Sequence, residues 1–460
     1  MDRNSLTQRS PDGHDVPATE PADHRALDRQ VLALAVPALG ALVAEPLFVL
    51  VDSVVVGTLG TPQLAGLALA GTVLTTVVGL CVFLAYTTTA DVARNVGAGR
   101  RDRGLRLGVE GMWLGLGVGV LLAAVLLVTA PTVLEALGAP PDVLPHAVAY
   151  LRWSAPGLPG MLVVLAATGV LRGLLDTRTP LVVAATGALV NAALSVALVL
   201  GAGMGVAGSG LGTAITQVSM GAVLAAVVAR GARRAGVPLA PSLAGFGAGL
   251  RSGAPLVVRT VSLRAAILLS AWVAAGLGTV TLAGHQVVAA LWGFTAFALD
   301  ALAIAAQALV GQALGAGDVD RTRRVLRRTL QWGVAAGAVL GVVLGAAGWW
   351  IAPLFSRDPD VRGAVALALV VVALTLPVAG WVFVLDGVLI GAGDGRYLAV
   401  VGLLTLAVYA PAAVAVRALA DDGAAGLAWS WVAFAGLFMA ARAVTTGLRA
   451  RGTAWMVTGT

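Results

Sequence analysis

Apolar stretches long enough to cross a lipid bilayer recur twelve times along this sequence. A helix of about 20 residues spans the roughly 30 Å of hydrocarbon, and a lone strand would leave its backbone unpaired there. Only 12% of the residues are charged, about half the fraction of a soluble domain. The sequence therefore predicts an all-α integral membrane protein with twelve transmembrane helices. They lie near residues 30–56, 64–92, 106–130, 146–171, 180–201, 206–229, 251–275, 282–312, 326–354, 363–390, 397–419 and 423–447.

The arginines between these stretches predict the orientation of the chain. The chain has no lysine, and its arginines gather in every second gap, whereas residues 57–63, 202–205 and 276–281 carry no charge. By the positive-inside rule, both termini are then cytoplasmic, as expected for a multi-pass protein of the cell membrane. The net charge of +7 is explained by topology, and we expect no nucleic-acid partner because no basic, aromatic-bearing soluble segment exists.

The two halves of the sequence repeat each other in one register. Adding 218 to a residue number of the first half gives its counterpart: Pro37 becomes Pro255, Gly97-Ala98-Gly99 becomes Gly315-Ala316-Gly317, and Asp102-Arg103 becomes Asp320-Arg321. Each half has an even number of spans, so the halves are parallel repeats, which predicts two six-helix lobes around a central cleft. The predicted boundaries are a disordered cytoplasmic tail at 1–29, an N-lobe at 30–230, a cytoplasmic linker at 231–250, a C-lobe at 251–447 and a cytoplasmic tail at 448–460.

Two carboxylates stand in the first predicted span. Asp52 and Glu45 are seven residues apart, so we expect them to share one face of the helix. Burial of an acid in the membrane favours its neutral form, so both are candidates for proton coupling. The alternative is a structural carboxylate held by hydrogen bonds between helices. Pro37 and Pro46 bracket this segment and predict kinks, which are either static or mobile.

The second half carries a different set of intramembrane charges. Asp52 corresponds to Ser270 and Glu45 to Leu263, so the first-half acids are not duplicated. Instead, the C-lobe spans hold Arg259, Arg264, Asp300 and Asp386. We expect these four charges to neutralise one another, because an unpaired charge in lipid is costly. The alternative is a network that changes partners between conformations.

The sequence lacks common motifs of nucleotide-binding proteins, hydrolases and metalloproteases. No G-x-x-x-x-G-K-[ST], G-x-S-x-G or H-E-x-x-H pattern occurs, and Cys81 is the only cysteine. We therefore expect no enzymatic activity, no cofactor and no metal site. Secondary active transport is the function that the architecture favours.

Several short motifs follow one another in a specific order along the chain: Leu34-Ala35-Val36-Pro37, Asp52-Ser53, Val56-Gly57-Thr58-Leu59-Gly60, Leu64-Ala65-Gly66, Gly97-Ala98-Gly99, Leu282-Ala283-Gly284-His285-Gln286 and the run from Leu299 to Gln307. In these motifs the chain resembles the MATE (multidrug and toxic compound extrusion) transporters, and within them the DinF-type branch, over about residues 28–447. The resemblance implies a cation-coupled antiporter that exports amphipathic or cationic organic compounds by alternating access.

The resemblance also implies a binding pocket. Asp52 matches the family's coupling acid in the first span. The family pattern Asn-x-x-x-Asp appears as Asn191-x-x-x-Ser195, and Thr213 completes the polar pocket. Because the second acid is absent, the expected coupling ion is a proton rather than sodium. The other expected partners are small organic substrates and the lipid bilayer, and we expect a monomer.

Three other functions remain open from the sequence. A flippase for a lipid-linked precursor would need a strongly cationic cleft, to which Arg259 and Arg264 would contribute while Asp300 and Asp386 offset them. A membrane-embedded enzyme would need a converging nucleophile, metal or acid pair, and the sequence offers none. A channel would need a filter ring, which a two-fold repeat supplies less readily than a cleft.

Overall fold

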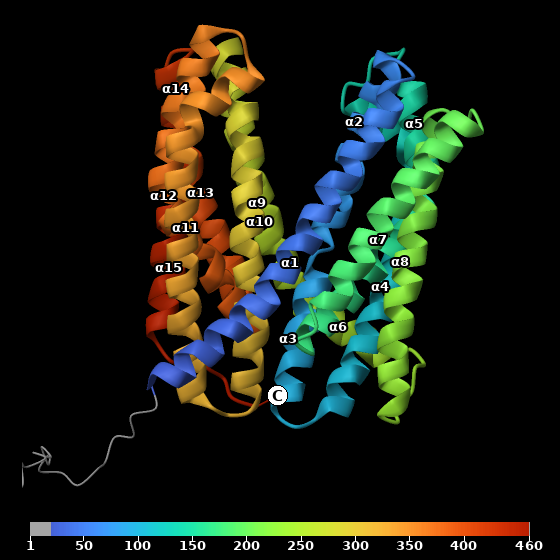
Figure 1. The fold of residues 1–460 in the computed structure, drawn as a ribbon, viewed down its shortest axis with the longest axis vertical. Coiled ribbons are helices and arrows are strands. Elements are labelled where there is room, and N and C mark those ends of the chain that lie inside the picture. The colour runs from blue at the N-terminus through green and yellow to red at the C-terminus, as the bar shows by residue number, and fades with distance from the viewer. Residues whose placement is uncertain (1–19, 460) are drawn as a thin grey trace, which may run out of the picture.

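The computed structural model describes residues 20–459, and every regular element within them is a helix. Twelve segments of this range are long and apolar enough to cross a membrane, which confirms the predicted number of spans. Figure 1 shows the helices as two groups that stand side by side. The first helix begins and the last helix ends at the lower end of this view, and we call this end the terminal face.

The N-lobe holds the first six spans. Its helices are α1 (Glu20–Gly57), α2 (Thr61–Leu80), α3 (Phe83–Gly97), α4 (Arg101–Ala136), α5 (Leu144–Ser154), η1 (Ala155–Gly157), α6 (Leu158–Gly173), α7 (Arg178–Ser195), η2 (Val196–Gly201) and α8 (Val206–Arg234). The second span is interrupted at Cys81 and Val82, where one helix stops and the next begins. The fifth span ends in the π-helical turn η2.

The C-lobe holds the other six spans. Its helices are α9 (Leu243–Leu277), α10 (Thr279–Gly315), α11 (Val319–Phe355), α12 (Pro359–Gly391), α13 (Gly395–Leu419), α14 (Ala424–Trp431), η3 (Val432–Phe438) and α15 (Met439–Arg451). The 218-residue register holds in space: the N-lobe span from Thr61 to Gly97 corresponds to Thr279 and Gly315, the bounds of α10. The C-lobe helix is continuous, however, where its N-lobe counterpart is broken.

Three predicted boundaries differ from the observed ones. Residues 20–29 are helical and belong to α1, whereas residues 1–19 of the predicted tail lie outside the described residues. The segment between α8 and α9 is shorter than the predicted linker, because α8 continues to Arg234 and α9 begins at Leu243. At the other end, α15 continues to Arg451. Polar residues extend α1, α8 and α15 past the apolar stretches from which their bounds were predicted, whereas α9 begins earlier with apolar and glycine residues.

The lobes touch each other near the terminal face through equivalent glycines of α3 and α10. A methyl group on Gly97 would collide with the backbone of Gln312, and one on Gly315 would collide with the backbone of Arg94. Gly97 and Gly315 are counterparts in the repeat, and so are Arg94 and Gln312. The contact is therefore symmetric, and small residues allow the two backbones to approach closely.

Polar contacts at the terminal face join the lobes further. Asp28 of α1 accepts hydrogen bonds from Arg328 of α11 at 2.5 and 2.6 Å and from Trp332 Nε1 at 2.8 Å. Arg94 of α3 donates to the carbonyls of Ala392 at 2.6 Å and Val457 at 2.7 Å. In Figure 1, α1 runs obliquely from the C-lobe side at this face to the N-lobe side at the opposite face. Both lobes are thus tied together at one end, and their ribbons diverge toward the other.

Candidate functional site

A single buried carboxylate is the centre of the N-lobe polar pocket, which consists of Asp52, Tyr150, Asn191, Ser195 and Thr213. The Asp52 side chain comes from α1 and is 2% exposed. Asn191 Nδ2 donates to Asp52 Oδ1 at 3.0 Å, and Ser195 Oγ donates to the same oxygen at 2.5 Å. The structure thus brings together the four residues that the sequence predicted for this pocket.

The second oxygen of Asp52 has a different environment. Thr213 Oγ1 lies 3.3 Å from Asp52 Oδ2, and the hydroxyl of Tyr150 lies 3.5 Å from Thr213 Oγ1. A hydroxyl group both donates and accepts, whereas the amide nitrogen of Asn191 only donates. The chain of hydroxyls from Tyr150 to Thr213 can therefore reverse its direction, so it can serve Asp52 in both protonation states.

The local sequence explains how four helices converge on one carboxylate. Asn191 and Ser195 are four residues apart on α7, so they lie on one face of that helix. Gly212 precedes Thr213 on α8, and a methyl group there would lie 3.4 Å from the Cβ atom of Leu194. This close approach of α8 to α7 places the Thr213 hydroxyl at the carboxylate.

Tyr150 was not predicted from the sequence, although a signal for it exists. It lies on α5 and is 5% exposed. The repeat shows it as a polar aromatic residue whose C-lobe counterpart is Ala368. The most useful signal for this pocket is thus the set of positions at which the two halves differ most.

The equivalent place in the C-lobe is an aromatic core. The counterparts of Asn191, Ser195 and Thr213 are Tyr409, Ala413 and Trp431, all of which are 1% exposed. Their neighbour Phe434 lies 6.0 Å from Tyr409 and 5.6 Å from Trp431, measured between ring centroids. Aromatic rings therefore fill the volume in which the N-lobe holds its acid, so only one lobe has a site of this kind.

Glu45 and Asp52 do not share an environment, although their spacing places them on one face of α1. The Glu45 side chain is exposed, and the charge that acts on it is Arg264 of α9 in the other lobe. Arg264 is exposed as well, and its guanidinium would lie 2.8 Å from a methyl group on Gly79 of α2. The two acids are about 10 Å apart along α1, and over this distance the same helix face leaves the pocket and reaches the surface that faces the C-lobe. Both Pro37 and Pro46 lie within α1, which continues through them.

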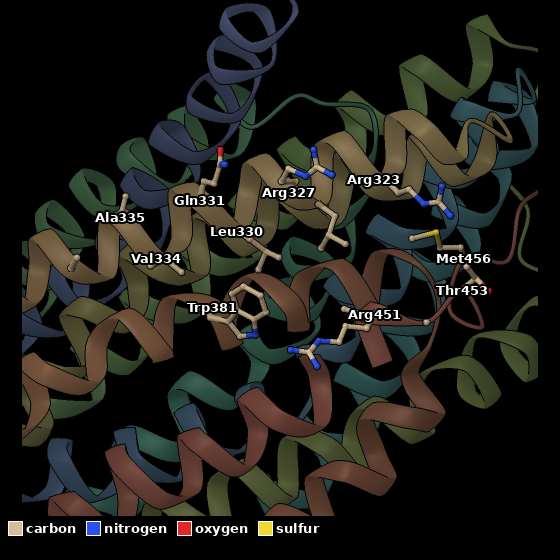
Figure 2. A pocket seen from close by; sticks show the side chains of 14 residues that line it. Arg323, Arg327, Leu330, Gln331, Val334, Ala335, Trp381, Arg451, Thr453 and Met456 are labelled. Carbon is tan, nitrogen blue, oxygen red and sulfur yellow. The ribbon is translucent and has the colours of Figure 1, made fainter. Parts of the chain in front are cut away.

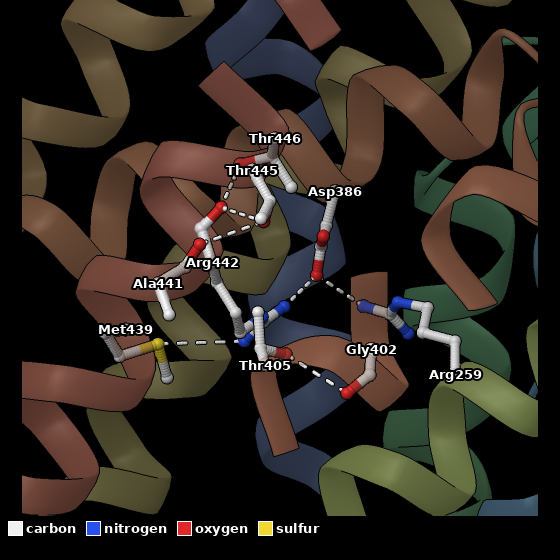
Figure 3. A network of polar contacts seen from close by, with 9 residues as sticks. All are labelled: Arg259, Asp386, Gly402, Thr405, Met439, Ala441, Arg442, Thr445 and Thr446. Carbon is white, nitrogen blue, oxygen red and sulfur yellow. Dashed lines mark hydrogen bonds and ion pairs between the residues drawn. The ribbon is translucent and has the colours of Figure 1, made fainter. Parts of the chain in front are cut away.

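Figure 3 shows the C-lobe charge network around Asp386. Arg259 Nη2 donates to Asp386 Oδ2 at 2.7 Å, and Arg442 Nη2 donates to the same oxygen. All three side chains are at most 9% exposed. Arg259 and Asp386 therefore form an ion pair, and Arg442 is a third member of the network that was not among the expected charges.

The other two expected members of the network differ in their positions. Arg264 faces Glu45, as described above. Asp300 lies near the network, because the charges of Arg172 on α6, Arg259 and Asp386 all act on it. Both Arg172 and Arg442 are near the ends of apolar stretches, where hydropathy alone does not distinguish a buried arginine from an interfacial one.

Metal coordination finds no support in residues 20–459, where no three His, Cys, Asp or Glu side chains lie close enough together to hold an ion. Asp52 instead has neutral partners. The oxygen of the Asn191 side-chain amide, Oδ1, is buried and has no hydrogen-bond partner among the described residues. A single acid surrounded by hydroxyls and an amide is suited to binding one proton.

Comparison with known proteins gives consistent matches over both lobes. Residues 37–197 and 255–414 match the MatE family model. Protein DETOXIFICATION 44, chloroplastic, of Arabidopsis thaliana is 31% identical over 412 residues, which cover 86% of this chain and 78% of that protein. DNA damage-inducible protein F of Escherichia coli K12 is 30% identical over 374 residues, covering 79% and 81% of the two chains.

Solved structures show the same fold at low sequence identity. The Vibrio cholerae MATE transporter VcmN has a TM-score of 0.84 at 21% identity, covering 95% of this chain and 99% of that chain. A MOP superfamily transporter from Pyrococcus furiosus has a TM-score of 0.83 at 19% identity, covering 93% and 96%. The arrangement of two six-helix lobes is therefore one that these proteins share.

Proposed function

Because the chain belongs to the MatE family of membrane transporters, we propose that it is an antiporter that exports amphipathic or cationic organic compounds in exchange for protons. The family and its transport function agree with the sequence motifs, and the Escherichia coli relative agrees with the DinF-type branch. Relatives named as probable multidrug resistance proteins, such as NorM of Pseudomonas syringae at 27% identity, support drug-like substrates.

The observation that carries the proposal is the single acid of the N-lobe polar pocket. A proton on Asp52 Oδ2 would donate to Thr213, which would then donate to Tyr150, while Oδ1 keeps its bonds from Asn191 and Ser195. Release of the proton reverses only the two hydroxyls. Protonation thus changes the charge of the pocket from −1 to 0, with the Thr213 hydroxyl as the acceptor for the added proton.

A proton fits this pocket better than sodium does. Ser195 occupies the place at which a second carboxylate would stand, so the pocket offers one negative charge. Sodium binding in a buried pocket requires several oxygen ligands arranged around the ion, whereas a proton needs only one oxygen and a hydrogen-bond acceptor. The Ser195 hydroxyl and the Asn191 side-chain amide both donate hydrogen bonds to Asp52, so they turn hydrogens rather than oxygens toward the carboxylate.

In alternating access, the surfaces at which the two lobes face each other open first to one side of the membrane and then to the other. We assign the terminal face to the cytoplasm, because arginines gather at that end of the spans. The contacts that join the lobes there keep this face closed in the observed state. Substrate would then bind between the lobes, where Glu45 and Arg264 are both exposed.

The flippase alternative has weaker support. A pyrophosphate group would need several cations without partners at the surface between the lobes. Arg259 is instead buried against Asp386, and Arg264 faces Glu45. The charges of the described residues therefore offset one another where such a substrate would bind.

The test is efflux of the cationic dye ethidium from proteoliposomes under an imposed pH gradient. We expect export that follows the pH gradient, is indifferent to sodium, and is lost in Asp52→Asn. The matched control is Asp142→Asn, which removes an exposed aspartate from the same lobe and should leave export unchanged. Export by Asp52→Asn at the wild-type rate, or export driven by sodium alone, would contradict proton antiport.

A further inference from the structure

A groove in the C-lobe lies close to the terminal face, away from the polar pocket. It has a volume of about 680 Å³ and is bounded by α11, by Trp381 of α12 and by residues 450–453 and 456 at the end of the chain. In Figure 2, Arg323 lies near Met456 and Thr453, the guanidinium group of Arg451 lies beside Trp381, and Arg327 projects from α11.

The α11 wall of the groove changes from basic to apolar along the helix. Its residues recur at intervals of three and four, so they form one stripe: Arg323, Leu326, Arg327, Leu330, Gln331, Val334, Ala335 and Ala338. The arginines come first, at the end of α11 near the terminal face, and the apolar residues follow toward the middle of the span. This polarity matches a molecule that has an anionic head and an apolar tail.

The basic end of the groove carries charge that the described residues do little to neutralise. No acidic side chain lines the groove. Arg323 has a distant exposed partner, Asp320 at 3.9 Å, whereas Arg327 and Arg451 have no ion-pair partner among the described residues. Three arginines with little compensation therefore line a groove that is otherwise largely apolar.

The groove is specific to the C-lobe, so it is not a by-product of the repeated fold. The N-lobe counterparts of Arg323 and Arg327 are Leu105 and Val109, each 2% exposed. In the N-lobe this stripe is packed against other helices. In the C-lobe the same stripe is open and basic.

We propose that this groove binds one anionic phospholipid from the leaflet at the terminal face. The phosphate lies among Arg323, Arg327 and Arg451, and an acyl chain follows Leu330, Val334 and Ala338 beside Trp381. Basic pockets between membrane helices recognise lipid head groups in this way. Because the groove includes residues of both α11 and the end of the chain, the bound lipid joins these two segments.

The test measures lipid retention by native mass spectrometry of the purified full-length protein, with phosphatidylglycerol or phosphatidylcholine added. The variant is Arg323→Gln/Arg327→Gln/Arg451→Gln. The control is Arg101→Gln/Arg103→Gln/Arg233→Gln, which removes three exposed arginines from the terminal face of the N-lobe. A second variant, Val334→Trp, fills the apolar part of the groove at an exposed position and keeps every charge.

We expect the wild type and the control to retain one phosphatidylglycerol in preference to phosphatidylcholine. The groove variant should bind it about 100-fold more weakly, since each arginine near a lipid head group contributes about fivefold, and Val334→Trp should also lose it. Equal retention of both lipids, equal loss in the control, or no retained lipid in the wild type would overturn the proposal. So would full competition by soluble glycerol phosphate, which would indicate a phosphate site without a lipid tail.

Discussion

Asp52 presents two oxygens whose surroundings differ. Oδ1 accepts from Asn191 and Ser195, and Oδ2 faces the hydroxyl of Thr213. Each oxygen has one neighbouring hydroxyl that can turn from donor to acceptor, but Oδ1 also faces the Asn191 side-chain nitrogen, which only donates. A proton on Oδ2 therefore leaves both hydrogen bonds to Oδ1 in place and has the Thr213 hydroxyl as its acceptor.

Replacing Thr213 by valine should reduce transport while preserving the fold. Valine has the same shape but leaves a protonated Asp52 without an acceptor at Oδ2, and an unmade buried hydrogen bond costs about 1–3 kcal/mol. We expect proton-driven ethidium export to fall roughly tenfold or more. Thr129→Val is the control, because the Thr129 hydroxyl bonds to Val125 of its own helix. A Thr213→Val protein as active as the control would show that this hydroxyl has no part in proton exchange.

The sequence predicted the pocket better than the charge network. Asp52, Asn191, Ser195 and Thr213 stand out as polar residues within apolar stretches, and they do meet. Arg442 and Arg172 are missed, because their neutralising partners lie on helices that are distant in sequence. A local sequence pattern shows that an arginine lies in an apolar stretch, but it does not show which distant acid neutralises its charge.

The helices themselves are the part of the fold that local sequence determines most fully. Length and hydropathy predicted all twelve spans, because each backbone must satisfy its own hydrogen bonds in lipid. The interruption at Cys81 and Val82 was not predicted. Neither residue breaks a helix by itself, so this feature comes from packing between elements.

One helix start in the C-lobe is capped by a residue from another loop. Asp422 accepts hydrogen bonds from the Thr281 hydroxyl at 2.7 Å and the Thr281 amide at 2.8 Å, at the first turn of α10. Burial by itself raises the pKa of Asp422, but these bonds and those from the amides of Val280 and Gly423 outweigh it and hold the pKa below its ordinary value.

Asp422→Asn should therefore lower the thermal midpoint of the protein at neutral pH. A carboxylate with a lowered pKa stabilises the fold above its unfolded pKa of about 3.9, and this contribution is lost as the pH falls through the folded value. The expected cost is less than about 1 kcal/mol, because the group is exposed. Thermal unfolding from neutral pH down to about pH 3 should show the difference from wild type shrinking. Asp421→Asn, a change at the exposed neighbouring residue, is the control, and a difference that grows on acidification would refute this role.

At the scale of the whole molecule, the lobes are joined at the terminal face and separate at the other. Asp28 and Arg328 form an ion pair between α1 and α11, and Arg94 binds carbonyls of the C-lobe and of the chain end. These contacts must break if the terminal face opens during transport. They are few and partly exposed, so they can hold one state without preventing exchange to the other.

Removing the pair between α1 and α11 should shift the molecule toward a form that is open at the terminal face. We expect Asp28→Asn to raise the ratio of that form to the observed one about threefold to tenfold, as the loss of a charge-assisted pair predicts. Spin labels on cysteines at positions 102 and 320, in a Cys81→Ala background, would report the distance between the lobes. Arg103→Gln is the control. An unchanged distance distribution in Asp28→Asn would exclude this pair as a determinant of the closed face.

The central claim is that Asp52 itself takes up and releases a proton, and infrared spectroscopy tests it without knowledge of the substrate. Difference spectra of membranes between alkaline and mildly acidic buffer report the C=O stretch of carboxylic acids as they become protonated. We predict a band that is present in the wild type, in Glu45→Gln and in Asp300→Asn, and absent in Asp52→Asn. A spectrum of Asp52→Asn that is identical to that of the wild type would contradict the claim, because the proton would then bind elsewhere.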